Sequence, residues 1–266
     1  MRFGLVACML LASAAPVVAQ DAPEIRQFDI ATIEKLGHDI YLQDQAVTHA
    51  TDALVALHPA AELGQQKVRG WIVWTTRPMA CAYAMSARAP TGWKRPMIED
   101  TASAKPRVVE PKDRILTEAE KAQFSARSAI SGHIARPCSR TYNTVALPDP
   151  QGDGWLVWAL ASSTTSKTWF IGGNYRFTVS KDGGSILRTD ALSMGCLTMA
   201  TPAPQPGQQL AAQVSSQLVS PIPVETAVFV NLESGLPMYV VTPDKTLWEL
   251  LKGRMHKLHM KPQPQK

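Results

Sequence analysis

The sequence has little cysteine, and its cysteines form neither a metal motif nor a redox motif. Four cysteines occur among 266 residues, and no two of them have the spacing of a CxxC pair or a zinc knuckle. The chain also lacks a GxSxG nucleophile elbow and a twin-arginine leader. Because these motifs are missing, we expect no catalytic residue and no cofactor. Because the twin arginine is missing, we expect any export to follow the general secretory route, in which the chain crosses the membrane unfolded.

The first 19 residues have the pattern of a cleavable signal peptide. Met1-Arg2 carries one positive charge, residues 3–15 are apolar or small almost throughout, and Val17-Val18-Ala19 suits a signal peptidase. We expect cleavage after Ala19, a periplasmic or secreted mature chain, and no stable membrane insertion. Lipidation at Cys8 is the alternative, but its apolar run would be only about four residues long.

The chain also has only a small excess of one sign of charge over the other. The formal net charge is +5, a mild basic excess that says little about partners. Nucleic acid is also not a usual ligand in the compartment that the signal peptide predicts. We therefore expect no nucleic acid partner, and expect instead an unknown protein or an envelope component.

Three cysteines remain after the predicted cleavage, which in an oxidising compartment implies one bridge and one spare thiol. Cys81 lies in the apolar stretch 79–85, which suits a buried strand. The predicted disulfide is therefore Cys138–Cys196. Closing that loop stabilises the fold by about 4 kcal/mol in the chain-entropy model.

The first region, residues 20–135, combines helices with a small sheet. A helix capped by Asp29 is predicted to run to His58, with Glu34 among the polar residues on its solvated side. The capping box at Thr117 opens a second helix that Gly132 ends. The predicted strands are 68–74 and 80–85, and the stretch 86–112 is irregular or a long hairpin, with 107–109 as a further strand.

The second region, residues 136–260, is predicted to be mainly antiparallel strands between Gly-rich and Pro-rich turns. A linker at 202–207, a short helix at 208–219 and a disordered tail at 261–266 complete the prediction. The fold class is thus α+β: an N-terminal helix on a small antiparallel sheet, then a larger antiparallel meander with one disulfide. The strands of this region are expected at 141–147, 155–161, 169–180, 185–192, 224–232, 238–241, 247–251 and 255–259. The last two are expected to pair across Lys252-Gly253.

The string Gly172-Gly173-Asn174-Tyr175-Arg176-Phe177, continued by Ser180, Asp182-Gly183 and Cys196-Leu197, resembles a pattern in uncharacterised secreted proteins of Gram-negative bacteria. In that pattern we expect His at the position of Asn174. The resemblance implies secretion, and it implies no activity that transfers to this chain.

Asn174, Tyr175, Arg176 and Asp182 form a candidate binding surface, because paired glycines let a ligand or another backbone approach a strand closely. A β-bulge explains the same glycines. Because catalytic motifs are missing, we interpret the protein as a non-enzymatic periplasmic or secreted binding or interaction module.

Two alternatives stay open. One is an envelope hydrolase that uses His133 or an unidentified serine. The other is a copper-binding protein, because thioether and imidazole groups suit copper. Its ligands would be Met255, His256, His259 and Met260. On a strand these residues would alternate between two faces, which separates the set.

Overall fold

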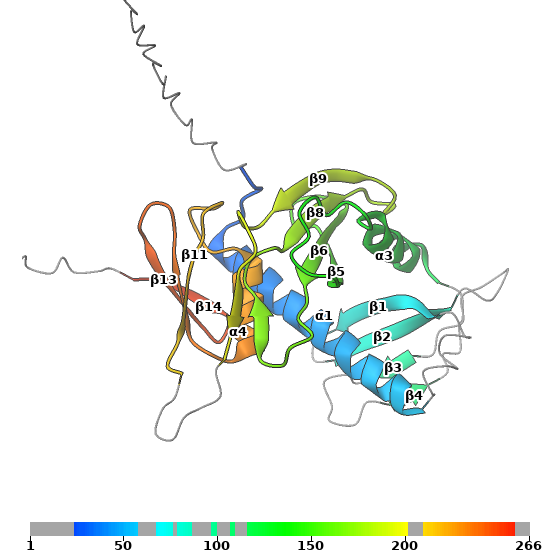
Figure 1. Ribbon diagram of the computed structural model, residues 1–266. Coiled ribbons are helices and arrows are strands. Elements are labelled where there is room, and N and C mark those ends of the chain that lie inside the picture. Colours follow the sequence, from blue (N-terminus) through cyan, green and yellow to red (C-terminus); the bar gives the residue numbers. More distant parts are fainter. Residues whose placement is uncertain are drawn as a thin grey trace, which may run out of the picture.

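The computed structural model describes residues 24–57, 68–76, 79–86, 97–99, 107–109, 116–201 and 210–258 (Figure 1). The predicted signal peptide, linker and tail lie outside these described residues. Helices pack against largely antiparallel sheets, and Cys138 is bonded to Cys196. The predicted α+β class and the predicted disulfide are therefore confirmed.

The first sheet has the order β1-β2-β3-β4, with each neighbouring pair antiparallel. Residues 107–109 form the predicted strand and pair with residues 97–99. Both strands lie in the stretch 86–112, for which a long hairpin was one of the two predicted alternatives. The bounds of its strands are β1 Val68–Thr76, β2 Met79–Ser86, β3 Met97–Glu99 and β4 Arg107–Val109.

The central sheet is a four-stranded antiparallel meander with the order β5-β6-β8-β9. Both of its faces are covered, since Trp158 is buried in one apolar cluster and Trp155 in another. The two tryptophans of β6 thus lie on opposite faces of a sheet that has a core on each side. The bounds of its strands are β5 Tyr142–Pro148, β6 Trp155–Ala161, β8 Tyr175–Val179 and β9 Ile186–Ala191.

The single strand expected at 169–180 is instead two strands. β7 (Thr168–Phe170) leaves the meander and pairs with β10 (Thr198–Ala200), and β8 begins only at Tyr175. The break falls at Gly172-Gly173, where Gly173 has φ +89°, a conformation that favours glycine.

Helix α1 (Ile30–Leu57) runs diagonally through the middle of the molecule, between the sheets (Figure 1). As predicted, Asp29 caps it by accepting a hydrogen bond from the Thr32 amide (2.7 Å). The solvated position predicted for Glu34 is wrong, because its side chain is 9% exposed and accepts a hydrogen bond from the Met255 amide (2.7 Å). The C-terminal sheet covers that side of the helix.

Helix α3 (Glu118–Ala129) joins the edges of two sheets. Its predicted capping box is confirmed, with Thr117 and Glu120 each bonded to the other's backbone amide. One turn further, the Gln123 side chain donates hydrogen bonds to the Val73 carbonyl of β1 (3.3 Å) and the Ala146 carbonyl of β5 (3.0 Å). The Arg127 side chain likewise donates hydrogen bonds to the Trp71 carbonyl of β1 and the Thr144 carbonyl of β5.

The C-terminal sheet has the order β11-β12-β13-β14 and includes the predicted hairpin across Lys252-Gly253. The helix predicted at 208–219 is wrong, because residues 213–216 form a strand parallel to β12 with alternating buried and exposed residues. The bounds of its strands are β11 Gln213–Ser216, β12 Met238–Val241, β13 Leu247–Leu251 and β14 Arg254–Leu258.

The strand predicted at 224–232 is also wrong, because this segment is helix α4 (Glu225–Ser234), which Gly235 ends at φ +66°. Six of its ten residues are buried, so β-branched side chains are held on several sides of the helix rather than on one strand face. α4 crosses α1 at Gly37, where an added Cβ would lie 2.9 Å from the Glu225 carbonyl oxygen. The close crossing thus requires glycine.

Candidate functional site

A cavity of about 580 Å³ opens beside the disulfide, at the end of the meander where β8 begins and β9 ends. Most of the surface that lines it is apolar. Glu24 and Arg136, both exposed, carry opposite charges at its wall. Its other lining residues are Ile25, Ala135, Cys138, Gly173, Asn174, Tyr175, Thr189, Asp190, Ala191, Ser193, Met194, Gly195, Cys196 and Val219.

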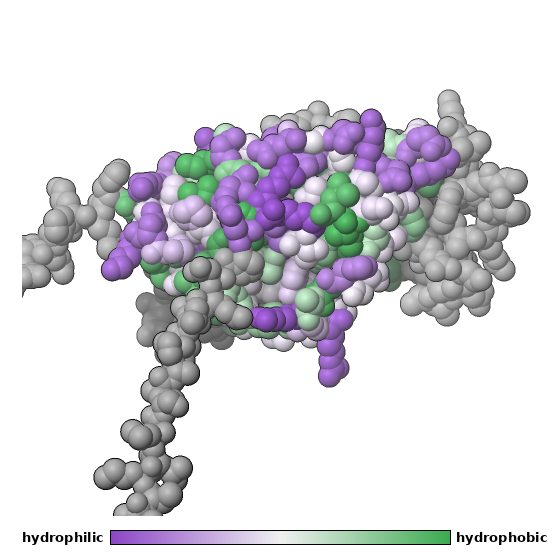
Figure 2. All heavy atoms as spheres, turned by 90° about the horizontal axis from the view of Figure 1, so that it is seen from above, coloured by the Kyte–Doolittle hydropathy of each residue, from purple (hydrophilic) through white to green (hydrophobic). Residues whose placement is uncertain are grey.

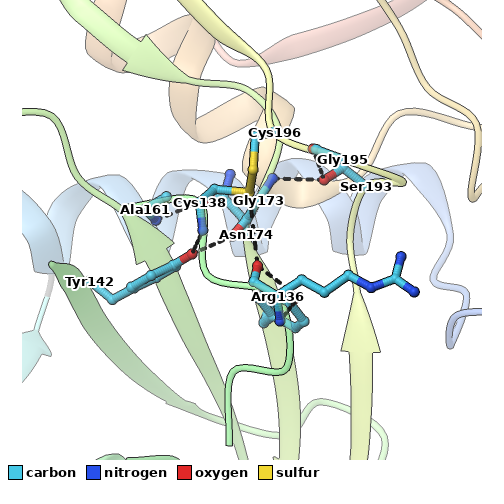
Figure 3. Close-up of a disulfide and its surroundings, with 10 residues drawn as sticks. Arg136, Cys138, Tyr142, Ala161, Gly173, Asn174, Ser193, Gly195 and Cys196 are labelled. Atoms are coloured by element: carbon cyan, nitrogen blue, oxygen red, sulfur yellow. Dashed lines mark hydrogen bonds between the residues drawn. A yellow bond between two sulfur atoms is a disulfide. The ribbon is translucent and has the colours of Figure 1, made fainter. Parts of the chain in front are cut away.

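Two tyrosine hydroxyls hold the loop that precedes β5 against the cavity. The Tyr142 hydroxyl accepts from the Cys138 amide (2.8 Å) and donates to the Gly173 carbonyl (3.2 Å), as Figure 3 shows. The Tyr175 hydroxyl accepts from the Arg136 amide (3.1 Å) and donates to its carbonyl (3.2 Å). The Arg136 guanidinium extends away from the disulfide (Figure 3), so its backbone rather than its charge is fixed.

The paired glycines let the chain's own backbone approach closely. A Cβ on Gly173 would collide with Cys138, and one on Gly172 would lie 2.9 Å from the Leu197 amide nitrogen. The Ser193 hydroxyl accepts from the Gly173 amide (2.7 Å) and donates to the Gly195 carbonyl (2.9 Å). Gly172-Gly173 therefore seats the disulfide and the loop after β9.

The predicted surface residues Asn174 and Tyr175 both line the cavity, although little of either side chain is exposed. The Asn174 amide group accepts a hydrogen bond from the Ala161 amide (2.9 Å) and donates one to the Phe170 carbonyl (3.4 Å). It thereby fixes the break between β7 and β8, a role that needs both a donor and an acceptor.

The surface position predicted for Arg176 is corrected by its burial, since its side chain is only 1% exposed. It forms ion pairs with Asp190 (2.8 Å) and with Glu225 of α4 (2.9 Å), and it donates to the Arg26 carbonyl (2.5 Å). Its guanidinium also lies over the Phe28 ring, 4.8 Å from the centroid. Arg176 is thus a core residue that ties the N-terminal segment and α4 to the meander.

Asp182 lies in the turn between β8 and β9, at the opposite end of β8 from the cavity. Hydrogen bonds from the Ser180 hydroxyl (2.5 Å) and the Gly184 amide (3.1 Å) lower the pKa of its carboxyl group. The structure therefore does not bring Asp182 together with the other three predicted residues.

The proposed copper ligands are only partly described. Met255 is buried and His256 is exposed, on opposite faces of β14 as alternation requires, while His259 and Met260 lie outside the described residues. Among the described residues, no three His, Cys, Asp or Glu side chains are grouped in a way that suits a metal ion. In the same part of the chain, no helix has the length and apolarity needed to span a membrane.

Several residues of the cavity carried no signal of their own in the sequence. Ser193 and Met194 lie in the loop after β9, and Ile25 comes from the segment before α1. The available signal was the predicted disulfide, because it places the neighbours of Cys138 beside the neighbours of Cys196.

A second, more polar cavity of about 370 Å³ lies between α1, α3 and β5. Burial lowers the pKa of Arg127 to about 10, against the opposing effect of Asp44. Burial raises the pKa of Asp44, although a hydrogen bond from Asn143 (3.1 Å) opposes the shift. Because Arg127 is engaged by backbone carbonyls of two sheets, this cavity fits a structural role better than a ligand site.

Glu233 of α4 provides a test of these burial effects. The pKa of its carboxyl group is raised mainly by burial and, to a smaller extent, by the negative charge of Asp44. A raised pKa in the folded state gives stability that is present at low pH and lost as pH rises through that pKa. We expect Glu233→Gln to be more favourable relative to wild type at pH 7 than at pH 4 in urea unfolding. Gln can still accept the hydrogen bond that Gln45 donates (2.8 Å).

The matched control for Glu233→Gln is the same substitution in an Asp44→Asn background. Without the Asp44 charge, the gain between pH 4 and pH 7 should shrink. A gain that is independent of pH would contradict the assignment.

Comparisons of the chain with protein-family models, with curated proteins and with solved structures return no match.

Proposed function

We propose that the protein is an exported, non-enzymatic binding module whose ligand site is the cavity beside Cys138–Cys196. The observation that carries the proposal is the cavity itself. It is largely apolar and concave, and hydrogen-bonded loops and a disulfide hold it in shape, as is typical of preformed ligand sites. The disulfide and the signal peptide pattern support an oxidising compartment.

The envelope hydrolase is supported less well by the same geometry. His133 is exposed in the turn that follows α3, where its amide donates to the Ile130 carbonyl (3.1 Å). It is not among the residues that line either cavity described above. Ser193, the serine of the larger cavity, uses its hydroxyl to hold Gly173 and Gly195.

The test expresses the tagged full chain in a Gram-negative host, recovers it from the periplasm and compares its captured partners with those of a cavity-filling variant. N-terminal sequencing should begin at Gln20. Ala135→Trp fills the cavity from its exposed wall, and Ser131→Trp adds the same bulk to an exposed residue outside it. We expect mass spectrometry to identify an envelope component captured by wild type and Ser131→Trp and lost in Ala135→Trp.

Two outcomes would count against the proposal. Retention of the full-length chain in the cytoplasm would exclude export. A captured set that is unchanged by Ala135→Trp would exclude the cavity as the binding site.

A further inference from the structure

We propose that the ligand is an extended polypeptide segment that adds as a strand to the free edge of β9 and inserts an apolar side chain into the disulfide cavity. The inference rests on the proposed function and names the class of partner. Strand addition of this kind combines main-chain hydrogen bonds with pockets for alternate side chains.

The outer edge of β9 offers unpaired backbone groups. Among the described strands β9 pairs with β8 alone, and the Leu192 amide donates to the Asn174 carbonyl (3.0 Å). In an antiparallel pair the bonded residues alternate, so Thr189 and Ala191 direct their N–H and C=O groups away from β8. No described residue forms a hydrogen bond with those backbone groups.

Side chains occupy comparable edges elsewhere in the molecule. Gln123 and Arg127 bond the carbonyl groups along β1 and β5, and Glu34 accepts the Met255 amide of β14. Such contacts are one way in which proteins protect sheet edges from further pairing. The edge of β9 at Thr189 and Ala191 lacks this protection in the described structure.

The arginine of β9 does not block the edge. Arg188 pairs with Asp190 (2.6 Å) and donates to the Glu24 carbonyl (2.6 Å), on the face of the sheet that the N-terminal segment crosses. Its guanidinium is therefore held on that face of the sheet and away from the outer edge of β9. The neighbouring Leu187 is 67% exposed and open to contact with a partner.

The open edge and the cavity are continuous, because Thr189 and Ala191 belong to both. A strand paired with β9 there would bring one of its alternate side chains to the cavity wall. Ile25, Met194 and Val219 give that wall an apolar character, so the inserted side chain should be aliphatic or aromatic.

The surrounding surface favours recognition through the backbone. β9 lies at the top of the molecule in Figure 1, and Figure 2 shows the face seen from above with separate hydrophobic groups among hydrophilic ones. A partner that relied on broad apolar contact would need a continuous apolar patch. Backbone pairing plus one buried side chain does not need one.

The test uses phage-displayed random linear dodecapeptides selected on the mature chain, followed by affinity measurements on synthetic copies. Thr189→Pro removes the outward N–H but leaves the hydrogen bonds to β8, and Thr189→Ala changes the same side chain while keeping that N–H. Circular dichroism and urea unfolding verify that both variants fold. We expect Thr189→Pro to weaken binding by about tenfold and Thr189→Ala to bind like wild type.

A second measurement reports on the backbone directly. Bound peptide should slow hydrogen exchange at the amides of Thr189 and Ala191. Methylation of every second peptide nitrogen should abolish binding when the methylated nitrogens are those that face β9, and not when they are the intervening ones. Peptides that bind Thr189→Pro as tightly as wild type but are lost with Ala135→Trp would overturn strand addition while retaining the cavity. If no selected peptide is affected by either variant, the peptide proposal fails as well, and the proposed function is then decided separately by its own capture experiment.

Discussion

Arg176→Met is expected to destabilise the protein by about 3–5 kcal/mol, because it leaves two carboxylates buried without their shared cation. Asp190 and Glu225 have side chains only 2% and 1% exposed. Glu225 also accepts from the Trp158 indole (2.8 Å), which neutralises none of its charge. Urea unfolding of the mature protein measures the loss.

The matched control is Arg188→Met, since Arg188 pairs with the same Asp190 (2.6 Å) from a side chain that is 45% exposed. Because solvent screens the Arg188 end of this pair, its expected contribution is only about 1 kcal/mol. The expected order is therefore a large loss for Arg176 and a small one for Arg188. Equal losses would show that Asp190, rather than the buried guanidinium, dominates the network.

Replacing both bridged cysteines by serine is expected to remove about 4 kcal/mol of stability, as the chain-entropy model gives for a loop of this length. The two residues are separated by 58 positions. We also expect ligand binding to be lost, because the bridge joins the loop before β5 to the loop after β9, and both loops line the cavity. Unfolding and peptide binding are measured with and without dithiothreitol.

The wild-type protein treated with dithiothreitol serves as the comparison. It should match the double variant Cys138→Ser/Cys196→Ser, and the variant itself should not respond to reductant. Binding that survives in the folded, reduced protein would show that the hydrogen bonds of Tyr142, Tyr175 and Ser193 suffice to keep the cavity in shape.

Local signals predicted much of the fold correctly. The capping box at Thr117, the turn at Lys252-Gly253 and the cysteine pair each act through neighbouring residues or a covalent bond, so the sequence displays them directly. The errors arose where distant contacts decide the conformation. α4 contains β-branched residues that suit a strand, but its packing against α1, β7 and β13 favours a helix.

The candidate site was predicted only in part for the same reason. Asn174 and Tyr175 were singled out and do line the cavity. Arg176 looked like a surface residue because its partners come from Arg26, Asp190 and Glu225, which no local pattern connects. That β9 is an edge strand follows only from the strand order of the folded sheet, because the alternation of apolar and polar residues does not show which strand is outermost.

The contacts of the N-terminal segment also set the order in which the molecule can be completed. Arg26 pairs with Asp149 (2.6 Å), a partner more than a hundred residues later in the chain, and Glu34 bonds the amide of Met255. The segment that is synthesised first therefore reaches its final place only after nearly the whole chain is available. Folding of this kind is dominated by non-local contacts and is expected to be slow, which is compatible with the proposed export of an unfolded chain.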